Sequence, residues 1–99
     1  MTEELKEFIQ SKDVRLFVLN KAISYVGEVI NETIDSYEIK SPMCIHRKRL
    51  LSYPSDIETI RLNKESILNA SALGLASKKF YYDQLMIFRL KVILDKLDN

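Results

Sequence analysis

The chain has 99 residues, of which 46% are hydrophobic and 29% are charged, and only 2 are glycine and 2 proline. This balance predicts one folded domain and excludes a disordered, fibrous or low-complexity chain. The 15 lysine and arginine residues nearly equal the 14 aspartate and glutamate residues, so net charge predicts no general attraction to nucleic acid. Any contact with a polyanion is therefore expected to be local.

Cysteine content and hydropathy indicate the compartment. The single cysteine, Cys44, excludes an intrachain disulfide framework. The N-terminal segment Met1-Thr2-Glu3-Glu4-Leu5 is acidic, where a signal peptide would be basic and then apolar. The apolar C-terminal stretch is interrupted by charges such as Arg89 and Lys91, so no run reaches the roughly 20 residues that cross a bilayer. We expect a soluble, cytoplasmic protein with no membrane contact.

The first elements follow from periodicity. Leu5, Phe8 and Ile9 have helical spacing and predict a short amphipathic helix within residues 2–12, with Thr2 as its N-cap. An alternation with a period of two begins at Val14 and predicts the first strand of an all-β unit that spans residues 13–71.

Four more strands are expected in this unit. The polar pair Asn20-Lys21 predicts a hairpin turn, and Gly27 inside the second alternating run is typical of a bulge or a sharp bend. The third run places four apolar side chains on one face, with Pro42 interrupting the ladder: Tyr37, Ile39, Met43 and Ile45. The pattern predicts a mainly β fold with a small, strongly bent, barrel-like sheet.

The last two strands are separated by turn signals. Ser52-Tyr53-Pro54-Ser55-Asp56 predicts the turn between the third and fourth strands, because proline fixes φ and the polar side chains bond their own backbone. Residues 57–62 and 67–70 predict the fourth and fifth strands, although the same segment also fits a helix.

A long helix is expected at the C-terminus, over residues 77–97, with Ser77 as its N-cap. Its apolar residues form two stripes. One stripe contains Tyr81, Leu85, Phe88 and Val92, and the other contains Met86, Leu90, Ile93, Leu94 and Leu97. We expect the first stripe to cover the chain's own sheet and the second to cover another subunit. All of residues 1–99 then belong to one domain.

The sequence offers little for catalysis. Cys44 and His46 are the only pair that could begin a nucleophilic site, but Cys44 lies in an apolar run that favours a buried hydrophobe. One cysteine and one histidine do not make a zinc site, and two isolated glycines do not make a phosphate loop. We therefore expect no enzyme activity, metal or cofactor.

Two segments have open interpretations. The basic run His46-Arg47-Lys48-Arg49 fits phosphate contacts, or simply a solvated strand end. The aromatic triplet Phe80-Tyr81-Tyr82 fits a platform for stacking bases, or packing of the helix against the body of the protein.

The pattern over residues 2–70 resembles the Sm-like family of small barrels, which includes LSm and Hfq proteins. Residues 14–21 followed by residues 25–29, with Gly27 at the bend, are similar to the first motif of that family. Residues 60–63 stand at the place of the second motif, where Leu62 replaces the glycine of the family's Arg-Gly pair. The chain most resembles divergent members of apparent marine-phage origin, and the C-terminal helix lies outside the shared barrel.

The resemblance implies a closed ring on the order of five to seven subunits, in which strand four of one subunit pairs with strand five of the next. It also implies that single-stranded RNA binds near the central pore. Carried over by position, the candidate RNA-binding residues are Asn31, Tyr37, Arg61, Asn63 and Lys64. Tyr37 would stack on a base and Arg61 would hold a phosphate or a base edge, whereas the alternative for Tyr37 is an aromatic side chain at the barrel rim.

The ring also implies an interface between subunits. The candidates on the strands are Ile60, Leu62 and Ile67, and those on the C-terminal helix are Met86, Leu90, Ile93, Leu94 and Leu97. Two other functions stay open. One is an assembly or scaffold protein that binds protein through the ring and the helix, and the other is an α+β module such as a dimeric transcriptional regulator.

Overall fold

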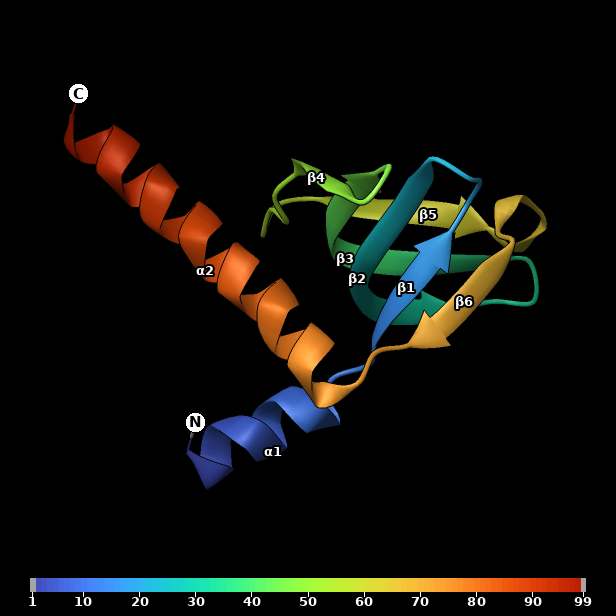
Figure 1. Cartoon of the computed structure of the whole chain (residues 1–99), viewed down its shortest axis with the longest axis horizontal. Coiled ribbons are helices and arrows are strands. Elements are labelled where there is room, and N and C mark those ends of the chain that lie inside the picture. Colours follow the sequence, from blue (N-terminus) through green and yellow to red (C-terminus); the bar gives the residue numbers. More distant parts are fainter. Residues whose placement is uncertain (1, 99) are drawn as a thin grey trace.

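The computed structural model describes residues 2–98, so Met1 and Asn99, which complete the predicted domain 1–99, lie outside the described residues. A short helix is followed by six strands and a long helix (Figure 1). The elements are α1 Glu3–Ser11, β1 Val14–Val18, β2 Ile23–Glu32, β3 Ser36–His46, β4 Arg49–Ser52, β5 Thr59–Asn63, the 3₁₀ turn η1 Lys64–Ser66, β6 Asn69–Ala72 and α2 Leu75–Leu97.

Helix α1 forms as its N-terminal signals predict. The Thr2 hydroxyl accepts a hydrogen bond from the Leu5 amide at 3.2 Å, and Glu3 and Glu4 occupy the first turn, where the helix dipole favours carboxylates. Ile9 is buried on the inner face of the helix. The expected helix within residues 2–12 is confirmed.

The strands form one antiparallel sheet in the order β4-β3-β2-β1-β6, and β5 also pairs with β3. The long β3 serves two partners: its first half pairs with β5, from Ser36 opposite Asn63, and its second half pairs with β4, from Cys44 opposite Ser52. Within the described residues β5 and β6 do not pair with each other, so the sheet is open along these edges. The predicted mainly β fold is observed, and its sheet is open rather than closed into a barrel.

The expected count of five strands is wrong, because the third run contains a hairpin. Arg47 and Lys48 form a two-residue turn, with His46 opposite Arg49, and both turn residues have left-handed φ values of 50° and 68°. Such turns are usually signalled by Asn-Gly, and two basic residues give no such signal. The last two strands begin two residues later than expected, and the helical alternative for that segment is wrong.

Gly27 lies at a bulge between β2 and β3, as expected from its isolated position. A side chain at this position would place its Cβ 3.2 Å from both Ile39 Cβ and the Lys40 carbonyl oxygen. Its φ is not positive, so the backbone conformation does not require glycine. Close approach of the two strands is therefore the reason for glycine here.

The same bulge divides the third run between two faces. Ser41 has a left-handed φ of 51°, and the register shifts between Val26, which faces Met43, and the next pair on β2. One extra residue moves the following side chains to the opposite face of the sheet. Met43 thus packs with Val26, whereas Tyr37 packs against Phe17, so the prediction of one shared face is wrong.

Helix α2 begins at Leu75, with Gly74 at the N-cap position, so the prediction of Ser77 as the cap is wrong. Tyr81 fixes the first half of α2 on the sheet, because its buried ring joins the core cluster and its hydroxyl donates to the Ser41 carbonyl oxygen at 2.7 Å. Burial raises the pKa of Tyr81 above its ordinary value.

One core cluster, formed by Val14, Val26, Met43 and Tyr81, lies under this half of α2. Phe17 and Ile39 are fully buried as well, on the other face of the bent sheet. The first predicted stripe is buried or half-buried along its length, and the C-terminal half of α2 extends away from the sheet (Figure 1). Neither α1 nor α2, as far as residues 2–98 describe them, has an apolar stretch long enough to cross a membrane.

Candidate nucleic-acid interface

Tyr37 stands near the start of β3, at the rim of the sheet, and is half-buried. Its ring lies 5.1 Å from the Phe17 ring, centroid to centroid. Two cations lie over the Tyr37 ring: Lys64 Nζ is 5.0 Å from its centroid and Arg15 Cζ is 5.5 Å away. The tyrosine is therefore an aromatic side chain that packs on Phe17 with two cations beside its ring, and its stacking on a base stays a prediction.

Carboxylates neutralise these cations. Lys64 Nζ lies 2.8 Å from Glu32, and Arg15 Nε lies 2.9 Å from Asp13 and donates a hydrogen bond to it. The hydrogen bond to Asp13 raises the pKa of Arg15 above its usual range. Two cations beside two carboxylates leave little net charge around the ring, so a phosphate has to compete with Glu32 and Asp13.

The other RNA candidates lie on the opposite face of the sheet. Arg61 stands opposite Glu38 in the ladder and forms an ion pair with it at 2.7 Å, and Asn31 stands opposite Glu38 on β2. Because neighbouring strand residues point to opposite faces, Arg61 and Tyr37 are not brought into one pocket within a chain. Asn63, opposite Ser36, shares the face of Arg61.

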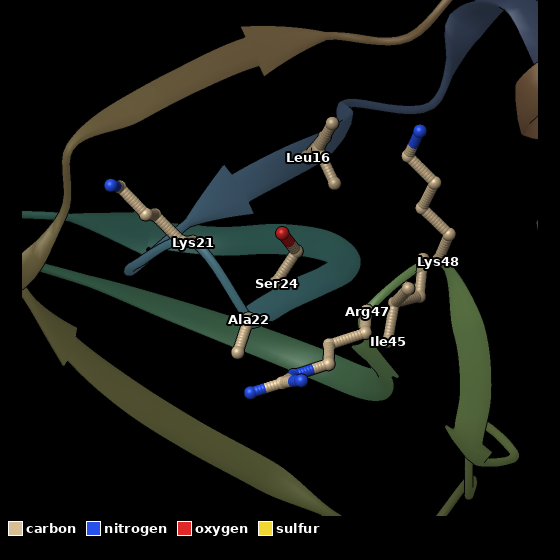
Figure 2. A pocket seen from close by; sticks show the side chains of 7 residues that line it. All are labelled: Leu16, Lys21, Ala22, Ser24, Ile45, Arg47 and Lys48. Atoms are coloured by element: carbon tan, nitrogen blue, oxygen red, sulfur yellow. The ribbon is translucent and has the colours of Figure 1, made fainter.

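The basic run lies at the other end of the strands, in the β3–β4 turn, where His46, Arg47, Lys48 and Arg49 are all exposed. A hollow of about 420 Å³ lies beside this turn and the β1–β2 loop. It is lined by Leu16, Lys21, Ala22, Ser24, Ile45, Arg47 and Lys48 (Figure 2). Lys21 from one loop and Arg47 and Lys48 from the other supply its charges, whereas His46 and Arg49 flank the turn outside the lining.

Hydrogen bonds fix the two loops relative to each other. The Arg47 amide donates to the Ala22 carbonyl oxygen at 2.8 Å. Within the β1–β2 loop, Asn20 Oδ1 accepts from the amides of Ala22 and Ile23 at 2.7 and 2.8 Å. The backbone that carries the three cations is thus held in place, while the long side chains stay exposed to solvent.

This hollow differs from the Tyr37 cluster in its charge balance. No carboxylate lines it, and among residues 2–98 neither Lys21 nor Arg47 nor Lys48 forms an ion pair. Three uncompensated cations around an apolar floor attract an anion more strongly than a set of closed ion pairs.

The pair considered for catalysis is separated by burial. Cys44 is only 7% exposed and packs in the sheet beside Tyr25, whose pKa is raised first by burial and then by Cys44. His46 is exposed at the end of the same strand. In the part of the chain that the structure describes, no three His, Cys, Asp or Glu side chains are placed to hold a metal ion.

The interface candidates divide into two groups. Ile60, Leu62 and Ile67 are half-buried within one chain. Those on α2 are exposed by between 51% and 75%: Met86, Leu90, Ile93, Leu94 and Leu97. A water-exposed apolar stripe of this length is unusual for a monomer, and its contact with another subunit stays a prediction.

Sequence reasoning missed Arg15, Lys21, Glu32 and Glu38. Lys21 gave a usable signal as the polar turn residue between β1 and β2. Because β2 and β3 are antiparallel, the start of β2 and the end of β3 meet at one end of the sheet. Recognition of the turn at Arg47 and Lys48 would therefore have brought Lys21 beside it.

Comparison of the chain with protein-family models, curated proteins and solved structures finds no match.

Proposed function

We propose that the chain is a non-catalytic, Sm-like protein that assembles into a closed ring and binds single-stranded RNA. The observation that carries the proposal is the position of β5 and β6. They follow each other in sequence through η1, yet β6 pairs with β1 and forms one end of the strand order, whereas β5 pairs with β3 next to the other end. Pairing of β5 in one subunit with β6 in the next continues the sheet, and a ring of such contacts removes the open edges.

RNA binding in the ring uses the rim residues near β5. Tyr37 and Lys64 act on one face of the sheet, where the aromatic ring of Tyr37 stacks on a base and the ammonium group of Lys64 holds a phosphate. Asn31, Arg61 and Asn63 act on the other face. Each stacking contact is worth on the order of 1 to 3 kcal/mol, and repetition around a ring multiplies the effect. Because the ion pairs of Lys64 and Arg61 must open, one subunit alone binds weakly.

Two measurements test the proposal. Light scattering gives the mass in solution, and a monomer or dimer would rule out the ring. Fluorescence anisotropy with a short uridine-rich RNA then compares Tyr37→Ala and Arg61→Ala with the wild type, and each is expected to weaken binding roughly tenfold. Tyr53→Ala, at an exposed tyrosine in the β4–β5 loop, is the matched control and should bind as the wild type does. Unchanged affinity in both rim variants would reject the site.

A second candidate function is protein assembly without RNA. The exposed stripe of α2 favours it, because it lies beside an apolar hollow of about 370 Å³ that Ile57, Phe88 and Val92 help to line. A helix from a partner, or from another subunit, buries such a stripe by packing along it.

A further inference from the structure

A groove follows one face of the sheet from the β3–β4 turn to the start of α2. The hollow of about 420 Å³ beside the turn adjoins a second hollow of about 350 Å³ beside α2, and both are lined by Leu16 and Ile45. Val26 and Met43 of the core cluster lie below the second hollow. Hollows of this size are in the range that accommodates small ligands.

The groove is charged at one end only. Among the described residues that line the groove, Lys21, Arg47 and Lys48 alone are charged, and all three line the hollow beside the turn (Figure 2). The described lining of the two hollows thus contains no carboxylate. An anionic group is therefore attracted to this end, where the amino and guanidinium groups form charge-assisted hydrogen bonds.

The other end carries an exposed aromatic ring. Phe80 lines the hollow beside α2 and is 52% exposed, whereas its neighbour Tyr81 is buried in the core. Tyr82 is half-buried and donates a hydrogen bond to Glu28. Of the aromatic triplet, Tyr81 and Tyr82 support the fold, and Phe80 is the ring that a ligand can reach.

The turn keeps its cations in an unfavourable backbone conformation. Arg47 and Lys48 both have left-handed φ values, 50° and 68°, at positions where Asn and Gly are preferred. Residues held in such conformations concentrate at functional sites, and here the strained positions are those that carry the charge.

We propose that this groove binds single-stranded nucleic acid, with a base packed on Phe80 and the apolar floor and neighbouring phosphates held by Lys21, Arg47 and Lys48. A strand fits because each nucleotide supplies both an aromatic base and an anion. The inference rests on the proposed function for its ligand class, but it uses neither Tyr37 nor the ring. The two sites lie at opposite ends of β2 and β3.

The charge at the turn is tested by Arg47→Asn/Lys48→Gly. This pair removes two cations and introduces the preferred turn residues, so the melting temperature should not fall. In fluorescence anisotropy with a labelled RNA of about twelve uridines, affinity should fall on the order of tenfold or more. The slope of log affinity against log salt concentration should also decrease by an amount equivalent to about two phosphate contacts. The control Lys91→Gln/Lys96→Gln removes the same charge from exposed positions of α2 and should bind as the wild type does.

The base contact is tested by Phe80→Ala, which should weaken binding by roughly fivefold or more, and by Phe80→Tyr, which should restore it. Because Phe80 is half-exposed, neither change should prevent folding. Full affinity in Phe80→Ala would contradict the base contact.

The two RNA sites are separated by comparing variants. If the turn variant loses affinity and Tyr37→Ala does not, the groove is the binding site and the proposed rim site is wrong. If Tyr37→Ala loses affinity and the turn variant does not, or if the α2 control loses as much as the turn variant, the groove is not a binding site. Displacement of the RNA by an acidic, apolar peptide of higher affinity would assign the groove to protein and overturn the inference. No RNA binding by the wild type would overturn both.

Discussion

Single residues set the curvature of the sheet. At Gly27 strand β2 approaches β3 so closely that a Cβ would crowd Ile39 and Lys40, and at Ser41 a left-handed residue completes the bulge. The Ser41 carbonyl accepts the hydrogen bond of Tyr81, so the bulge also fixes where α2 begins to cover the sheet. The bend and the position of the helix therefore depend on the same few residues.

Gly27→Ala should destabilise the protein by about 1 to 3 kcal/mol, because the new Cβ would lie 3.2 Å from backbone and Cβ atoms that cannot rotate away. The free energy of unfolding from urea denaturation measures this cost. Gly74→Ser is the control, since nothing lies within 4 Å of a Cβ there and serine is a favoured N-cap. It should leave stability unchanged or raise it by about 0.5 kcal/mol. Equal stability of the two variants would contradict the close-approach account.

At the scale of elements, α2 is attached to the sheet at two places. Its first half is anchored through Tyr81. Its middle is attached to the β4–β5 loop by a bidentate ion pair, in which Arg89 Nε donates to Asp56 Oδ2 at 2.7 Å and Arg89 Nη2 donates to Asp56 Oδ1 at 2.9 Å. Hydrogen bonds from Arg89 lower the pKa of Asp56 below its ordinary value. The C-terminal end of α2 extends away from the sheet (Figure 1).

This ion pair gives a pH dependence. A carboxyl group with a lowered pKa stabilises the fold above its unfolded pKa of about 3.9, and the contribution disappears as pH falls through the lower folded value. Because both side chains are more than a third exposed, the contribution at pH 7 should be below about 1 kcal/mol. A double-mutant cycle with Asp56→Asn and Arg89→Gln should show this coupling at neutral pH, and the coupling should disappear as pH falls through the lowered folded pKa of Asp56. Coupling that persists in acid would show that the contact is not electrostatic.

At the scale of the whole molecule, two kinds of surface within residues 2–98 have no partner in a single chain. The edges of β5 and β6 present backbone groups, and α2 presents an apolar stripe. Backbone pairing tolerates side-chain changes, whereas packing along the stripe does not. The two surfaces can therefore be tested separately.

Leu90→Glu/Leu94→Glu should lower the mass of the assembly in light scattering, because charges in the stripe oppose its burial against another subunit. Lys91→Glu/Lys96→Glu changes charge on the same turns at positions outside the stripe and should leave the mass unchanged. An unchanged mass in the stripe variant would assign assembly to the strand edges alone. It would also remove the observation that favours the second candidate function.

Local pattern was sufficient for several features. Helical spacing and the Thr2 cap predicted α1, alternation predicted β1 and β2, and the isolated glycine predicted the bend at Gly27. The two apolar stripes of α2 were likewise predicted from the sequence. The stripe that begins at Tyr81 is buried or half-buried, and the stripe that begins at Met86 is exposed. These features depend on residues a few positions apart, whose preferences act before any long-range contact forms.

Features that depend on pairing between distant strands could not be predicted from the sequence. The left-handed turn at Arg47 and Lys48, the reversal of faces after Ser41 and the split of the rim candidates between two faces all depend on strand register. Register is a long-range property, and a shift of one residue reverses which face a side chain occupies. For the same reason the basic run could be read as a charged segment from the sequence, but its position beside Lys21, at the end of an apolar groove, required the folded chain.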